Sequence, residues 1–181
     1  MIAFEFMLRV TKAYNLQKQT LFLALSLLCR SLHKLFQEGT IFMMTPYELL
    51  VMAMVCLNLS SKYYQRMVFK VGDLLKLNGF SQFPSLKPEE WRQTEFQVLQ
   101  LVSFKVGEHS TLDEIIEEGL KKTLEFAKNE AQSEITFTEE IKNKAFLMGF
   151  MLSIAQEIDR PYSKCDVAAA TIYMTIKLLE K

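Results

Sequence analysis

The segment between residues 45 and 65, TPYELLVMAMVCLNLSSKYYQ, constrains the fold more than any other part of this 181-residue chain. It is apolar on almost every side, and a soluble helix of that kind must be wrapped by other helices. Thr45 is placed as its N-cap, Pro46 lies in the first turn, and Glu48 stands where it closes a capping box. The apolar stretch 49–57 is shorter than the about 20 residues that a membrane span needs. The segment therefore predicts the central helix of a helical domain.

The amino-acid composition limits which classes of protein this chain can belong to. Half of the residues are hydrophobic, which is enough for a core, and the 21 basic residues equal the 21 acidic ones. A chain with this balance has no overall field that favours nucleic acid or an anionic membrane. The three cysteines, Cys29, Cys56 and Cys165, are widely spaced in apolar helical stretches, which indicates reduced thiols that behave as small hydrophobic residues. We expect an intracellular protein without a signal peptide, metal or cofactor.

The spacing of apolar residues predicts an all-α fold, since it is mostly helical and the chain has only six glycines and four prolines. Five helices are expected in the first part, over about 2–14, 19–35, 45–65, 71–77 and 88–104. In the first of them, Phe4, Met7, Leu8 and Val10 are expected to face the core. Three more helices are expected over about 111–128, 138–158 and 163–181. We therefore divide the chain into an N-terminal domain, 1–107, and a second domain, 108–181.

The sequence of the last expected helix can be aligned with that of the central helix. Ser163 aligns with Thr45 and Asp166 with Glu48, so both helices begin with the pattern of a capping box before an apolar run. Each helix is the third in its half of the chain. This repetition favours an internal duplication of one helical unit, and the alternative is that any two buried helices look alike.

Four segments follow one another in the order and spacing of a known family. They are IAFEFMLRVTKAYNLQKQTLFLALSLLCRSL, CLNLSSKYYQ, TEFQVLQLVSFKV and SKCDVAAATIYM. The chain resembles a cyclin, in the style of the A and B types, and the resemblance covers nearly all of it. This implies one complete five-helix cyclin box followed by a partial second repeat of about three helices. It also implies a regulatory protein of the nucleus or cytoplasm whose partner is a cyclin-dependent serine/threonine protein kinase.

The resemblance further implies where the kinase binds. In the family, a lysine at the end of the third helix and a glutamate of the fifth hold the kinase beside its mobile αC helix, and the matching positions are Lys62 and Glu95. An ammonium donates hydrogen bonds to backbone carbonyls and a carboxylate accepts them from N–H groups, which suits both roles. The alternative is that Lys62 is only a cation at a helix C-terminus. The apolar contacts would come from Leu59, Tyr63, Tyr64, Phe69 and Leu99.

A groove for substrates or inhibitors that carry an RxL motif is also implied. Arg9 stands where the family has an acidic residue that meets the arginine of the docked peptide, and like charges there repel. Leu50 replaces a glutamine of the groove. Outside the groove, Tyr64 and Gln65 replace the acidic pair that usually follows the lysine of the third helix, so part of the family's polar rim is missing. We therefore expect the groove to be inactive or to read a different motif. Its expected lining is Ile2, Ala3, Phe6, Arg9, Leu49 and Leu50.

The second repeat ends at Lys181, two helices short of the family's five. The last helix is then expected to have one uncovered apolar side, which favours self-association or a covering partner. That side carries Ala168, Ile172, Met174 and Ile176.

The sequence shows no catalytic constellation. His33 and His109 have no metal-ligand spacing, and no nucleophile elbow, P-loop or dinucleotide fingerprint is present. The acidic residues at 113–118 are expected on a solvated helix face with Lys121 and Lys122 at i+4. We expect that the chain is not an enzyme. The alternative to a kinase regulator is a degenerate cyclin-fold adaptor that binds peptides, transcription proteins or cell-cycle proteins without activating a kinase.

Overall fold

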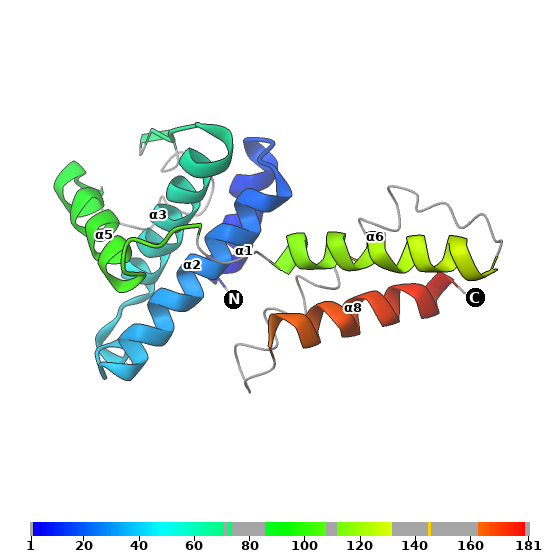
Figure 1. Cartoon of the computed structure of the whole chain (residues 1–181). Coiled ribbons are helices and arrows are strands. Elements are labelled where there is room, and N and C mark those ends of the chain that lie inside the picture. The colour runs from blue at the N-terminus through cyan, green and yellow to red at the C-terminus, as the bar shows by residue number, and fades with distance from the viewer. Residues whose placement is uncertain are drawn as a thin grey trace. The chain divides into compact units, whose positions relative to one another are not determined.

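The computed structural model describes residues 2–70, 72–73, 86–107, 112–131, 145 and 163–179. Every regular element within these residues is a helix, so the all-α prediction is confirmed. The chain forms two compact units, Met1–His109 and Ser110–Lys181. Among the described residues, no helix has the length and apolar character needed to cross a membrane. Figure 1 shows the helices of both units.

The elements follow the order that the sequence predicts. The first unit contains α1 (Ile2–Ala13), α2 (Lys18–Gln37), the 3-10 helix η1 (Ile41–Met43), α3 (Pro46–Gln65) and α5 (Pro88–Leu101). The second unit contains α6 (Leu112–Ala131) and α8 (Lys164–Leu179). Of the helix expected at 71–77 the structure describes residues 72–73, which are helical, and of the helix expected at 138–158 only Ala145, also helical. The rest of both lies outside the described residues.

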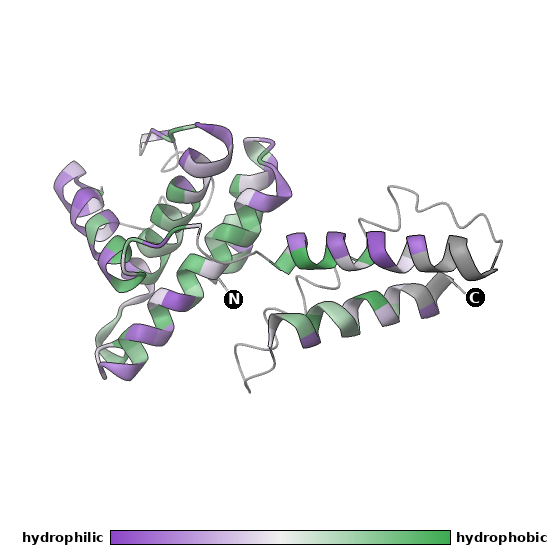
Figure 2. Cartoon of the chain, viewed as in Figure 1, coloured by the Kyte–Doolittle hydropathy of each residue, from purple (hydrophilic) through white to green (hydrophobic). Residues whose placement is uncertain are grey.

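Helix α3 is the centre of the first unit. Every residue from Leu50 to Ser61 is buried, because α1, α2 and α5 all pack against the helix. Figure 2 shows hydrophobic residues gathered on α3 and on the neighbouring α1 and α2. The expectation of a wrapped central helix is therefore confirmed, and the side chains available to solvent on α3 lie toward its two ends.

The predicted capping boxes begin both α3 and α8. The backbone N–H of Glu48 donates to Thr45 Oγ1 at 3.2 Å, and the N–H of Thr45 donates to Glu48 Oε2 at 2.7 Å. The N–H of Asp166 donates to Ser163 Oγ at 3.2 Å, and the N–H of Ser163 donates to Asp166 Oδ2 at 2.9 Å. Each box satisfies N–H groups that a helix start otherwise leaves without a partner.

Some burial predictions are wrong. Leu8 is exposed whereas Met7 and Val10 are fully buried. A helix turns by about 100° per residue, so the stripe that covers α3 cannot include Leu8 as well. Cys165, expected to behave as a core residue, lies exposed in the first turn of α8.

The second unit covers part of the apolar side of α8 by itself. Helices α6 and α8 pack against each other, and Ala168, expected to be uncovered, is buried. Gly119 permits this close packing, because a Cβ there would overlap the side chain of Ile172. Tyr173 and Met174 remain exposed, and the side chain of Ile176 lies outside the described residues.

The outer face of α6 carries the ion pairs that the sequence predicts. Lys121 Nζ lies 3.2 Å from Glu117 Oε1, and Lys122 Nζ lies 2.7 Å from Glu118 Oε1. All four side chains are exposed, so these pairs form a solvated surface.

The burial of α3 leads to the first prediction. Leu57→Ala removes a side chain that is fully enclosed, and we expect it to lower the free energy of unfolding by about 2–5 kcal/mol. The matched control, Leu8→Ala on the exposed side of α1, should cost less than about 1 kcal/mol. Urea denaturation of the three proteins measures both values, and equal losses would contradict the assignment of α3 as the wrapped helix.

A second prediction concerns pH. The pKa of Glu48 is lowered from its ordinary value of 4.5 because the carboxylate accepts hydrogen bonds from the backbone N–H and the hydroxyl of Thr45. A lowered folded-state pKa stabilises the fold above pH 4.5, and this contribution is lost as the pH falls through the folded-state value. The stability advantage of the wild type over Glu48→Gln should therefore shrink on acidification. Urea denaturation at a series of pH values tests this, and a constant difference would contradict it.

Candidate functional site

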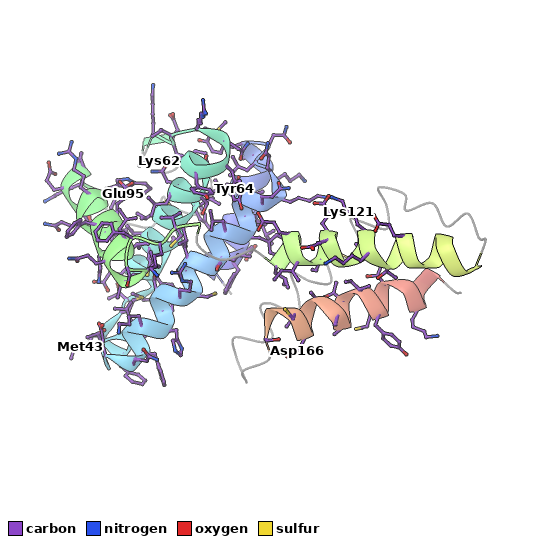
Figure 3. The ribbon with its side chains drawn as sticks, viewed as in Figure 1. Met43, Lys62, Tyr64, Glu95, Lys121 and Asp166 are labelled. Carbon is purple, nitrogen blue, oxygen red and sulfur yellow. The ribbon has the colours of Figure 1, made fainter. Side chains whose placement is uncertain are left out.

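Lys62 and Glu95 meet at the rim of the first unit. Lys62 lies in the last turn of α3 and Glu95 in the middle of α5, and Lys62 Nζ donates to Glu95 Oε1 at 2.5 Å. Figure 3 shows the two side chains on neighbouring helices. The side chains are 36% and 21% exposed, so the pair is partly shielded but remains reachable from solvent. The structure thus brings together the two charged residues that the sequence singled out.

The burial of α3 explains why this ion pair lies at the surface. Lys62 is the first residue of α3 after the buried run that ends at Ser61. An ammonium has three donors and a carboxylate has about four acceptor positions, and a single bond between them occupies one of each. The remaining donors and acceptors can bind the backbone of a partner, while the pairing prevents either charge from being desolvated alone.

Leu59 and Phe69, expected to supply surface for a partner, are instead buried in the core. Arg66 adopts a left-handed conformation with φ 54°, which ends α3 and turns the following residues back over the helix. The Phe69 ring contacts the Tyr14 ring edge-on at 5.0 Å, and the Phe69 N–H donates to the buried Asn58 Oδ1 at 3.0 Å. The burial of these two residues argues against their assignment to the contact surface.

Tyr63, Tyr64 and Leu99, which are expected to contact a partner, keep accessible surface on the same two helices as the ion pair. Tyr63 is exposed, while Tyr64 and Leu99 are half-buried. The two tyrosine rings pack edge to face with centroids 5.1 Å apart. The hydroxyl end of Tyr63 lies over Gly107, where a Cβ would overlap it. The absence of a side chain at position 107 therefore allows the ring to lie at this place.

Two exposed phenylalanines that the sequence prediction missed lie on the same helix as Glu95 or just after it. Phe96 and Phe104 are both more than half exposed, and their ring centroids are 6.1 Å apart. Phe104 is held by the end of α5, where Ser103 and Phe104 are left-handed and the Phe104 N–H donates to the Leu99 carbonyl at 2.7 Å. From the sequence alone, an apolar residue at a helix end such as Phe104 cannot be distinguished from a core residue. Further exposed apolar side chains follow α3 at Met67 and Val68.

Gln65 stands where the resemblance implies an acidic residue, and its side chain turns toward α2. Its Oε1 accepts hydrogen bonds from the Gln17 N–H at 3.1 Å and from Thr20 Oγ1 at 2.8 Å. Gln17 is the N-cap of α2 and makes no cap hydrogen bond with its own side chain, and Gln65 satisfies its backbone N–H from the end of α3. The substitution therefore links the end of α3 to the start of α2.

Arg30 of α2 fixes the segment that follows α5. Its guanidinium donates to the carbonyls of Lys105 and Val102 at 2.9 and 3.3 Å. Val102 is the C-cap of α5, and its carbonyl also accepts the Lys105 N–H at 3.1 Å, whereas Lys105 lies in the segment after the helix. Arg30 thereby helps to hold the segment that carries Phe104 and Gly107 at the end of α5.

The expected substrate-docking groove is not an open surface. Ala3, Phe6 and Leu50 are buried, because α1 packs its apolar stripe against α3. The side chain of Ile2 lies outside the described residues. The burial of Ala3, Phe6 and Leu50 argues against their assignment as residues that contact a docked peptide.

The other two positions of that groove, Arg9 and Leu49, provide no carboxylate that could pair with the arginine of an RxL peptide. Arg9 is exposed and forms an ion pair with Glu5 at 2.5 Å, so a cation occupies the place of the expected acid. Leu49 is half-buried. The expectation that RxL peptides are not bound in the usual way stays a prediction.

The structure also describes one of the two histidines. His33 is exposed and its Nε2 lies 2.8 Å from Gln37 Nε2, as expected of a surface histidine. His109 lies outside the described residues. Within the residues that the structure describes, no group of three or more His, Cys, Asp or Glu side chains could hold a metal ion.

Comparison with known families identifies the first unit. Residues 1–107 match the family model of the cyclin N-terminal domain. The match covers more than half of the chain and includes both Lys62 and Glu95. No curated protein sequence matches the chain.

The contact between Tyr63 and Gly107 gives a third prediction. Gly107→Ala should turn the Tyr63 ring away from its present place, because the new methyl group would occupy the position of the ring. The matched control is Gly72→Ala, since a Cβ at Gly72 meets no atom within 4 Å. With fluorotyrosine incorporated, the ¹⁹F resonance of Tyr63 should shift in the first variant only. An unchanged resonance would show that Gly107 does not set the position of the ring.

Proposed function

We propose, since the chain belongs to the cyclin family, that it is the regulatory subunit of a cyclin-dependent serine/threonine protein kinase, which it binds and activates. Cyclins are regulatory proteins that act through their partners and not through catalysis of their own. The observation that carries the proposal is the ion pair of Lys62 and Glu95 at the rim of the first unit. Its two residues match, by the resemblance of the sequence, the lysine and glutamate with which cyclins hold their kinase.

The ion pair supplies the polar part of the proposed interface. Lys62 donates to backbone carbonyls of the kinase beside its αC helix, and Glu95 accepts from backbone N–H groups. Hydrogen bonds with one charged partner are about twice as strong as neutral ones. Because Lys62 and Glu95 already neutralise each other, docking does not bury an isolated charge. The pair therefore fixes the register of the complex at a low desolvation cost.

The exposed aromatic and aliphatic side chains around the pair supply the contact area. Tyr63 lies beside Lys62, and Phe96 lies beside Glu95 in sequence and packs against Phe104. Burial of apolar surface contributes about 25 cal/mol per Å², and large aromatic residues dominate the binding energy of many interfaces. These side chains replace the buried Leu59 and Phe69 as the proposed contact residues.

Activation follows from differential binding. A kinase without its regulator has the αC helix displaced, which breaks the Lys–Glu pair that its catalysis requires. A surface that binds the αC helix better in its active position shifts the population toward that position. We place this activity inside the cell, in the nucleus or the cytoplasm, where such a kinase works on its protein substrates.

The fourth prediction tests this interface. Lys62→Ala and Glu95→Ala should each weaken binding to a cyclin-dependent kinase by about 10-fold or more, because each leaves the other charge unpaired in the complex. The double variant should lose little more than either single one, since the two residues act as a unit. Lys121→Ala, which breaks an exposed ion pair of the second unit, is the matched control and should bind normally. Affinities are measured against a panel of purified kinases.

Two outcomes would change the proposal. If the double variant binds every kinase as the wild type does, the assigned interface is wrong. If the wild type binds a kinase through this interface without raising its rate of substrate phosphorylation, the chain is an adaptor of cyclin fold and not an activator.

A further inference from the structure

The first unit contains a groove at the end of α3 away from Lys62. It encloses about 630 Å³ between the end of α2, η1, the first turns of α3 and one face of α5. Its apolar part is formed by Leu35, Met43, Met44, Met52 and Leu101. Met43 and Met44 give the groove an adaptable surface, because their unbranched side chains can repack around different partners, while the buried Met52 lies beneath them.

Carboxylates dominate the charged part of the groove. Glu38, Glu48 and Glu90 line it, and the single basic residue of the lining is Lys34. Lys34 already faces Glu38 at 3.9 Å, which leaves Glu48 and Glu90 without a cation among the lining residues. Among the described residues that line it, the groove therefore combines apolar side chains with an excess of negative charge.

Neither carboxylate is saturated by its known contacts. The hydrogen bonds that Glu48 accepts in the capping box all go to its Oε2, so Oε1 takes no part in the cap. Glu90 Oε2 accepts a long bond of 3.4 Å from the Tyr47 hydroxyl. A carboxylate has about four acceptor positions, and an incoming ammonium or guanidinium can use those that remain.

The edge of the groove exposes large apolar side chains to water. Met43, labelled in Figure 3, is 85% exposed, and its neighbour Phe42 is 82% exposed. The Phe42 ring packs against the exposed Phe36 at a centroid distance of 6.1 Å. Adjacent exposed apolar residues at the edge of a groove are typical of a surface that another molecule covers.

The groove is separate from the site of Lys62. Glu48 and Lys62 stand at opposite ends of α3, about 21 Å apart along the helix axis. On α5, Gln93 and Gln97 line the groove, while Glu95 lies on a different face of the same helix. An occupant of the groove therefore need not displace a protein bound at Lys62.

We propose that this groove binds a short basic amphipathic segment of a partner protein. Its apolar side chains pack on Met43 and Met44 above the buried Met52, and its lysine or arginine faces Glu48 and Glu90. The charge of the groove selects this occupant, since a phosphate backbone or an acidic peptide would be repelled by the carboxylates. The inference goes beyond kinase binding and does not depend on it.

A random-peptide display library, selected on the full chain, provides the probe. Enriched peptides should combine lysine or arginine with leucine, phenylalanine or methionine, and their affinity should fall with salt concentration. Synthetic copies should bind Met43→Glu and Glu90→Lys about 10-fold or more weakly. The matched controls are Met174→Glu in the second unit and Glu89→Lys, which is on α5 but does not line the groove. Both should bind as the wild type does, and so should Lys62→Ala.

Methionine methyl spectra place the bound peptide. With ¹³C-methyl methionine, the resonances of Met43, Met44 and Met52 should shift on titration while that of Met174 stays in place. The proposal is overturned if no basic apolar peptide is enriched, if the groove variants bind as well as the controls do, or if other methionines shift instead. It is also overturned if light scattering shows a dimer that Met43→Glu abolishes, because a second copy of the chain would then cover the groove. Loss of kinase binding in Lys62→Ala with peptide binding intact separates this inference from the proposed function.

Discussion

The burial of α3 on all sides is the constraint on which the rest of the first unit depends. Because the residues from Leu50 to Ser61 are all enclosed, the hydrophobic effect requires α1, α2 and α5 to pack around this one helix. The polar side chains of the buried run are satisfied locally, as in the bond from Ser60 Oγ to the Cys56 carbonyl at 2.8 Å. Groups that can meet another molecule must therefore stand toward the ends of α3. Glu48 stands at its beginning and Lys62 at its end.

Different local hydrogen bonds and backbone conformations form the two ends of α3. At the beginning, the capping box fixes Glu48, which also lines the groove beside η1, through bonds to its Oε2 alone. At the end, the left-handed Arg66 stops the helix just after Lys62, and Gln65 ties the last turn to α2. Helix α5 contributes to both regions through separate faces. Helices α3 and α5 thus carry the ion pair of Lys62 and Glu95 at the end of α3. About 21 Å away along α3, the same two helices help to form the acidic groove that methionines line.

The local features of this arrangement could be predicted from sequence, since they depend on residues that are near one another in the chain. The capping boxes of Thr45 and Ser163 are of this kind. The pairing of Lys62 with Glu95 spans 33 positions and was reached only through the resemblance to a family. The burial of Phe69 could not be predicted, because it follows from the chain reversal at Arg66, a residue type with no special preference for a left-handed conformation. The exposure of Met43 and Phe104 likewise depends on what other helices leave uncovered.

We propose that the end of α3 and the face of α5 beside it hold a kinase. Hydrogen exchange of the chain, measured by mass spectrometry with and without a cyclin-dependent kinase that it binds, tests this proposal. We expect slower exchange around Lys62 and in the stretch from Glu95 to Gly107, with the kinase αC helix protected in turn. Protection confined to η1 and the start of α3, or to the second unit, would contradict it.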